Sequence, residues 1–402
     1  MEGGREENAA SATVEGRVST VPALLPPGDG KAAARFAFVD GLRGLAALSI
    51  VVFHIWWYEP APRRALEQAH WIVDETLMRA RGGVQILLVV SGFVIAYTLR
   101  KTWFTPGEVF SFIGRRLVRL VPAYWVAIGV VIVVNALCRG LWGLPSPFDG
   151  QPSFLRAAAH MAFLQDIVGH ESLGAGMWTL CIEMQFYVVA IVGWGLAQRL
   201  FPRPAANEPQ PADWGLIAIF APLAIASLLH WRSMDGTDPW VTHFLWMFFL
   251  GMSTWWTLDR TLPLAAFALV ISIAVVDLML CNTETWVNAE WRYWNGVALA
   301  TTLAIFTAGW RHRLHVWLNW RPLQYLGRIS YSLYLIHFPI CHLVTSAGWK
   351  MCEYAPTPLQ ARMILLAAVP ASLLAGHVLY MLVEAPSARW AARMKRATAA
   401  SV

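Results

Sequence analysis

The chain has 402 residues, of which 57% are hydrophobic and 14% are charged. Soluble globular proteins carry about 25% charged residues, so this composition excludes a soluble enzyme, a disordered chain and a collagen-like chain. It favours a polytopic membrane protein, and the net charge of +6 is then interpreted as basic residues gathered in cytoplasmic loops, not as a nucleic-acid site.

Residues 1–35 are polar and rich in Ala, Gly, Glu and Pro, so we expect a flexible cytoplasmic tail without a cleaved signal peptide. Ten apolar segments follow, each close to the length of about 20 residues that crosses a bilayer. They are 38–57, 82–99, 119–138, 177–198, 213–231, 240–258, 262–280, 294–310, 328–348 and 360–383. Residues 154–167 are amphipathic and are expected to lie in the membrane interface.

The predicted fold class is therefore an all-α polytopic integral membrane protein with about ten transmembrane helices. With the N-terminus inside, the inner segments hold 20 Lys and Arg residues and the outer loops hold 10. This ratio places both termini in the cytoplasm. We predict a transmembrane domain over residues 36–390 and a short cytoplasmic tail over 391–402.

The first predicted span carries two ionisable side chains, Arg43 and His54. Eleven positions separate them, which is three helical turns plus about 20°, so both face the same side, about 16 Å apart along the axis. Ionisable groups inside a bilayer are costly and are functional candidates by default. A single buried histidine is more often structural, but together these residues suggest an anion binder and a proton acceptor on one helix face.

The arginine, the ten residues after it and the histidine lie in the context DGLRGLAAL at 40–48. This pattern resembles the membrane-bound acyltransferase family 3, which includes O-acyltransferases of surface polysaccharides and of macrolides. Five further segments resemble family elements in the same order: GGVQILLVVSGFVIA (82–96), RRLVRLVPAYW (115–125), MWTLCIEMQFY (177–187), RISYSLYLIHFPI (328–340) and VEAPSAR (383–389). The chain departs from the pattern at Leu87 and Leu88, where the family usually has aromatic residues.

The resemblance covers about residues 36–390 and implies an acyl-CoA-dependent O-acyltransferase in the cell membrane, inner or plasma, as a multi-pass protein. Family members move an acyl group, usually acetyl, from acyl-CoA to a hydroxyl of a sugar or related acceptor. The expected partners are acyl-CoA, a carbohydrate, glycan or small-molecule acceptor, and the lipid bilayer. We expect a stand-alone form without the SGNH domain fused to some members, so a separate extracytoplasmic acyl-transfer partner remains open.

An acyl-CoA that binds from the cytoplasm needs cationic side chains near the inner face of the membrane to bind its phosphates. Arg116 and Arg119 are at i and i+3, on one face of the third span, and Arg43 lies near their level. Guanidinium groups suit phosphate. We predict that these three arginines bind the donor; the alternative is that they only anchor the cytoplasmic side of the membrane.

Transfer to a hydroxyl needs a base, because an alcohol is a weak nucleophile until its proton is withdrawn. His54 is the predicted general base, and Glu183, at a similar depth in the fourth span, is the predicted second acidic group. The alternative for Glu183 is a helix–helix hydrogen bond. The family also has a histidine at the position of His337, where a structural hydrogen bond is an equal alternative. Ser91 lies beside Gly92, and small residues there favour close helix packing over a nucleophilic role. An acylated His54 that passes the group across the membrane is a second mechanism.

Two other functional classes remain open. A transporter would also have ten spans and intramembrane charges, but it predicts paired repeats with broken helices. A structural or sensory membrane protein predicts that losing His54 or Arg43 matters only through folding. No metal is expected, because the 11 histidines lack HxxxH or HExxH spacing.

Overall fold

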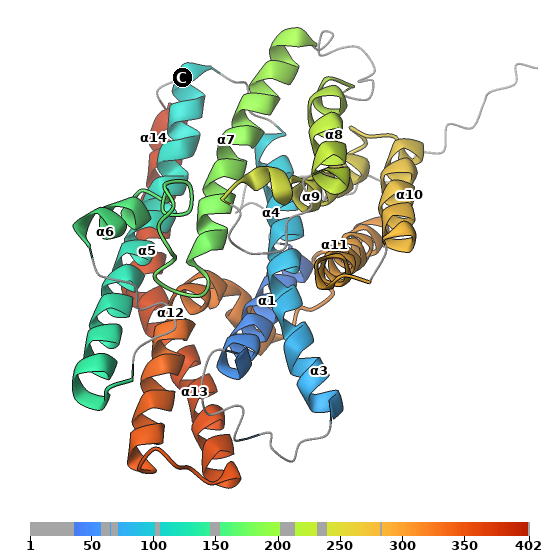
Figure 1. Cartoon of the computed structure of the whole chain (residues 1–402). Helices are drawn as coiled ribbons and strands as arrows, with labels where there is room; N and C mark the ends of the chain where they lie inside the picture. Colours follow the sequence, from blue (N-terminus) through green and yellow to red (C-terminus); the bar gives the residue numbers. More distant parts are fainter. Residues whose placement is uncertain are drawn as a thin grey trace, which may run out of the picture.

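The computed structural model describes residues 36–57, 65, 71–100, 105–144, 153–201, 214–230, 239–281 and 284–400. Within these ranges all regular elements are helices, and they form the bundle in Figure 1. The helices are α1 (Ala37–Trp57), α3 (Trp71–Arg79), α4 (Gly83–Leu99), α5 (Pro106–Trp142), α6 (Phe154–Met161), α7 (Met177–Leu200), α8 (Trp214–Leu229), α9 (Leu245–Leu258), α10 (Leu264–Leu280), α11 (Trp286–Trp310), α12 (Arg321–Met351), α13 (Pro358–Leu379) and α14 (Ala385–Ala400). The expected tail over 1–35 lies outside the described residues.

Each of the ten predicted apolar segments overlaps a helix, which confirms the all-α membrane fold. Five helical stretches in the described part are long and apolar enough to cross a membrane: Ala37–Trp57, Trp71–Leu99, Gly107–Trp142, Met177–Leu200 and Pro358–Met394. The total number of spans stays a prediction. At the C-terminal end, α14 continues through residue 400, so most of the segment expected as a tail is helical.

The third predicted span begins earlier than expected. Helix α5 starts at Pro106 because Thr105 caps it: the Thr105 side chain accepts a hydrogen bond from the Glu108 backbone N–H at 3.3 Å. Proline at the first helical position favours the same start. The early start places Arg116 and Arg119 inside a regular helix, where their spacing of three residues sets them on one face.

Helices α1 and α12 run parallel and touch backbone to backbone at two glycines, Gly44 and Gly327. A Cβ atom added to Gly44 would lie 2.7 Å from the Gly327 nitrogen and 2.9 Å from the Leu323 carbonyl oxygen. Small residues allow this approach between membrane helices. The contact brings the two helices close enough for their histidines to meet further along.

Helix α14 lies behind α5 in Figure 1 and closes one side of the bundle. A π-helical turn, Tyr380–Glu384, joins it to α13. This turn buries Glu384, which accepts hydrogen bonds from the Ser332 hydroxyl at 2.6 Å and the Ser332 backbone N–H at 3.2 Å. The carboxylate therefore ties the start of α14 to the middle of α12.

The first part of the predicted amphipathic segment 154–167 forms α6, which ends at Met161, and the two faces of this helix are distinct. Phe154 and Leu155 are exposed, whereas Arg156 and His160 are buried. Arg156 donates to the carbonyls of Glu171 and Ser172, both at 3.0 Å. The inward polar face thus fastens the loop that leads into α7, and the outward apolar face is free to contact lipid.

His160 holds the same loop by a second set of bonds. Its Nδ1 lies 2.8 Å from the Arg156 carbonyl oxygen, and its Nε2 accepts the Leu173 backbone N–H at 2.9 Å. This arrangement requires a neutral imidazole. Burial lowers the pKa of His160 to about 4, so the ring stays neutral near pH 7.

Candidate functional site

A cavity of about 470 Å³ opens between α1, α4, α5, α7, α12 and α14. Four of the five side chains predicted from the sequence line it: Arg43, Arg116, Arg119 and Glu183. They come from three helices, so the fold brings together residues that are up to 140 positions apart in the chain. The cavity has a basic end at Arg43, Arg116 and Arg119, and a far end at Tyr334 and Thr179. Tyr334 lies seven residues along α12 from Gly327, which contacts Gly44 beside Arg43.

The arginines at the basic end are arranged to receive an anion. The guanidinium of Arg116 lies 5.0 Å from the centre of the Tyr187 ring, and its Nη1 donates to the Tyr187 hydroxyl at 3.5 Å. The Nε atom of Arg119 is buried and has no hydrogen-bond partner among the described residues. Arg119 also lies within electrostatic range of Arg43 and Arg116. A buried N–H without a hydrogen-bond partner is costly, and so is the repulsion between neighbouring arginines. A bound anion would accept the hydrogen bond and reduce the repulsion.

Glu183 accepts two hydrogen bonds through one carboxylate oxygen. The donors are the Ser91 hydroxyl, at 3.2 Å, and the Tyr187 hydroxyl. Because Tyr187 accepts from Arg116, a continuous chain of hydrogen bonds runs from Arg116 through Tyr187 to Glu183. The carboxylate is therefore coupled to the basic end of the cavity.

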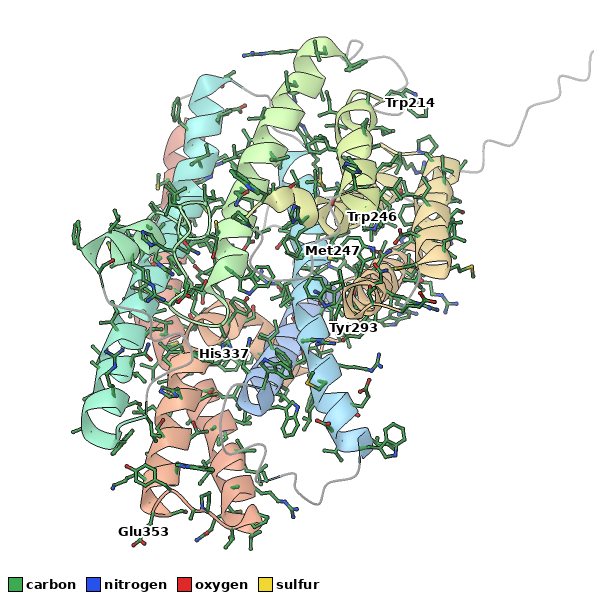
Figure 2. The ribbon with its side chains drawn as sticks, viewed as in Figure 1. Trp214, Trp246, Met247, Tyr293, His337 and Glu353 are labelled. Atoms are coloured by element: carbon green, nitrogen blue, oxygen red, sulfur yellow. The ribbon has the colours of Figure 1, made fainter. Side chains whose placement is uncertain are left out.

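His54 lies outside the set of described residues that line the cavity. Its side chain is 7% exposed and pairs with His337 of α12, labelled near the centre of Figure 2. The distance from His54 Nδ1 to His337 Nε2 is 2.9 Å. The sequence placed Glu183 at the depth of His54; the structure places Glu183 on the cavity wall and His54 against His337.

The contacts of His337 fix which nitrogen of each ring carries a proton. His337 Nδ1 faces two carbonyl oxygens, of Tyr334 at 2.8 Å and of Leu333 at 3.2 Å, so this nitrogen is the protonated donor. Neutral His337 then has its lone pair on Nε2 and accepts from His54 Nδ1–H. In neutral His54 the remaining lone pair is on Nε2, which is the arrangement of a proton acceptor.

Sequence reasoning left the role of His337 undecided, although a signal was present. Gly44 and His54 are separated by ten positions, and so are Gly327 and His337. In two parallel helices that touch at these glycines, equal spacing puts both histidines about 15 Å further along, at one height.

Within the described ranges, no group of three or more His, Cys, Asp or Glu side chains is placed to hold a metal ion. The site combines a cavity with arginines at one end and a histidine pair one turn of α12 beyond the other end. Such a site can bind an elongated anionic molecule and offer a base near its far end.

Comparison with known proteins gives a consistent result. A family described as an acyltransferase domain matches residues 36–380. The chain is 28% identical over 315 residues to BcsY of Komagataeibacter xylinus, which is named a membrane-bound transacylase, covering 75% of this chain and 72% of BcsY. It is 23% identical over 342 residues to the peptidoglycan O-acetyltransferase OatA of Listeria monocytogenes, covering 76% of this chain and 49% of OatA.

The O-acetyltransferase OatA of Staphylococcus aureus is 24% identical over 331 residues, with 77% of this chain and 51% of OatA covered. The chain thus spans about half the length of the OatA proteins and 72% of BcsY. No solved structure matches the chain.

Proposed function

We propose a donor, an acceptor and a base for this chain from the premise that it belongs to the acyltransferase-domain family, which matches residues 36–380. It is a multi-pass membrane protein and an acyltransferase of that family. The proposed reaction moves an acyl group, with acetyl the first expectation, from acyl-CoA to a hydroxyl of a carbohydrate or related acceptor at the cell membrane. The names of the OatA relatives support O-acetylation as the reaction class.

The observation that carries the proposal is the order of groups along the site. Arginines lie at the end of the cavity that we expect at the cytoplasm, where acyl-CoA is available, and the histidine pair lies beyond the opposite end. The phosphates of CoA would bind Arg43, Arg116 and Arg119. The buried Nε–H of Arg119, which has no hydrogen-bond partner among the described residues, fits an anionic ligand. The pantetheine arm would then extend the thioester toward His54.

In the proposed transfer, His54 Nε2 takes the proton of the acceptor hydroxyl as the hydroxyl oxygen attacks the thioester carbonyl carbon. The C–S bond then breaks, the acyl group stays on the acceptor oxygen, and the CoA sulfur takes the proton from His54. During this step His54 is positively charged, and the lone pair of His337 Nε2 accepts its Nδ1–H. Glu183 would act as the second acidic group, linked to the donor phosphates through Tyr187 and Arg116.

The test is release of free CoA from acetyl-CoA by the purified protein in detergent, with and without pooled glycan acceptors. Loss of a general base lowers a rate by about 10²- to 10⁴-fold, so His54→Ala should be nearly inactive. The control is His315→Ala, because His315 stacks on Phe36 away from the cavity. Equal CoA release by wild type and His54→Ala would refute the base. Label from acetyl-CoA trapped on His54 without acceptor would favour the acylated intermediate over direct transfer.

A further inference from the structure

Tyr334 lies at the boundary between the cavity and the histidine pair. Its side chain lines the far end of the cavity beside Thr179, and it also lines a separate void of about 10 Å³ next to Phe338 and Pro339. His337 follows one turn later on α12, with 6.0 Å between the two ring centres. An acyl group that moves along the cavity toward His54 therefore meets the Tyr334 ring first.

The hydroxyl of Tyr334 is anchored at the start of α7. It lies 2.6 Å from the Thr179 hydroxyl oxygen, and both side chains are buried. The Thr179 hydroxyl donates to the Gly176 carbonyl at 3.0 Å, so in the first contact Tyr334 is the donor and Thr179 the acceptor. The ring is thus fixed at its outer tip as well as by its own helix.

Gly176 holds one side of the same ring. A Cβ atom added at Gly176 would lie 2.8 Å from the Cζ atom and 2.9 Å from the Cε1 atom of Tyr334. Contacts of that length require one of the groups to move, so the ring has no room to shift toward α7. The small void beyond it stays separate from the cavity as long as the ring keeps this position.

We infer that Tyr334 determines the size of the acyl group that this site transfers, with Thr179 and Gly176 holding the ring in place. The inference rests on the proposed function, because it takes the cavity as the acyl-CoA site. Mutation of the Tyr334 side chain should leave the histidine pair intact. The His337 Nδ1–H donates to the backbone carbonyl of residue 334, which is present whatever the side chain.

The first experiment truncates the ring. Purified wild type and Tyr334→Ala are compared in kcat/KM for acetyl-CoA, butyryl-CoA and hexanoyl-CoA by CoA release. A single methylene in an apolar pocket changes discrimination by about 10- to 200-fold. We expect the ratio of hexanoyl to acetyl turnover to rise at least about tenfold in Tyr334→Ala, because the space of the removed ring is added to the cavity and opens it to the small void beyond.

Two further variants act on the ring from α7. Gly176→Ala adds a methyl group against Tyr334 at a backbone φ of −109° that alanine can adopt, so the ratio of butyryl to acetyl turnover should fall. Thr179→Val removes the hydroxyl that anchors the ring and keeps the side-chain size, so this ratio should rise. The control is Phe267→Ala on α10, a buried aromatic residue outside the cavity lining, which should leave the ratios unchanged.

An active Tyr334→Ala protein with the wild-type chain-length profile would overturn the inference and leave the proposed function standing. An equal shift in Phe267→Ala would overturn it too. If wild type releases CoA from none of these donors, the proposed function fails and the inference fails with it. Should Tyr334→Ala not elute as a folded protein in size-exclusion chromatography, the opposite shifts of Gly176→Ala and Thr179→Val decide the matter.

Discussion

Replacing His337 by phenylalanine tests whether the histidine pair works as one unit. The substitution keeps a ring at this fully buried position but removes the nitrogen that accepts His54 Nδ1–H. The arginines and Glu183 on the cavity wall are untouched. We therefore expect kcat to fall while the KM for acetyl-CoA stays near its wild-type value.

The size of the fall follows from the charge that His54 gains. A hydrogen bond between neutral groups contributes about 0.5–1.5 kcal/mol, and one to a charged group about 1.5–3 kcal/mol. The bond from His54 to His337 changes from the first kind to the second when His54 takes a proton, a difference of about 1–1.5 kcal/mol. Since about 1.4 kcal/mol corresponds to a tenfold change in rate, kcat should fall about tenfold.

The assay is steady-state CoA release at saturating acceptor for wild type, His337→Phe, His337→Gln, His54→Ala and the double variant His54→Ala with His337→Phe. His337→Gln should recover most of the activity, because an amide oxygen can accept the same bond. Residues that act as a unit are not additive, so the double variant should be no slower than His54→Ala alone. A further tenfold loss in the double variant would show that His337 acts independently of His54 and would refute the reasoning.

Three other predictions concern the rest of the molecule. Arg119→Gln should raise the KM for acetyl-CoA about tenfold or more, since hydrogen bonds to charged groups contribute about 1.5–3 kcal/mol; unchanged binding in calorimetry would contradict its role. Glu183→Gln, which keeps the shape but loses the charge, should lower kcat more than it changes KM; a protein with wild-type kinetics would leave Glu183 a purely structural hydrogen-bond acceptor. Burial lowers the pKa of His160 from 6.5 to about 4, so the unfolded state binds the proton first and stability should fall as pH drops from about 6.5 to 4. Melting temperatures in detergent should show this decline, and His160→Gln should flatten it.

Composition and hydropathy were sufficient to predict the fold class, because a bilayer leaves helices as the simplest way to satisfy the backbone. Helix ends were harder to predict. The early start of α5 depends on the cap at Thr105 and on Pro106 at the first helical position, and an average of hydropathy over a window registers neither signal. Hydropathy locates the part of a helix that meets lipid, whereas capping residues set where the helix begins.

The candidate site was predicted in its parts but not in its contacts. The motif order identified the arginines and Glu183, and the structure places them around one cavity. The small residue beside Ser91 was expected to allow close packing, and a Cβ at Gly92 would indeed overlap the Phe248 backbone. The pairing of His54 with His337 spans 283 positions, and helical periodicity relates only residues on the same helix.

The register between α1 and α12 joins the two ends of the site. Helix α1 supplies Arg43 to the cavity and α12 supplies Ser330, Tyr331 and Tyr334, and each helix also supplies one histidine of the pair. The Gly44–Gly327 contact fixes their relative height at one point, and the 2.9 Å histidine contact fixes it again about 15 Å further along. A slip of one turn, about 5.4 Å, would separate the histidines and move Tyr334 relative to Arg43. The distance from Arg43 to His54 is set by α1 alone, since both residues lie on that helix. A donor of fixed length, bound by its phosphates, would then present its thioester at a constant distance from His54, and a fixed separation of the reacting groups is what an efficient transfer requires.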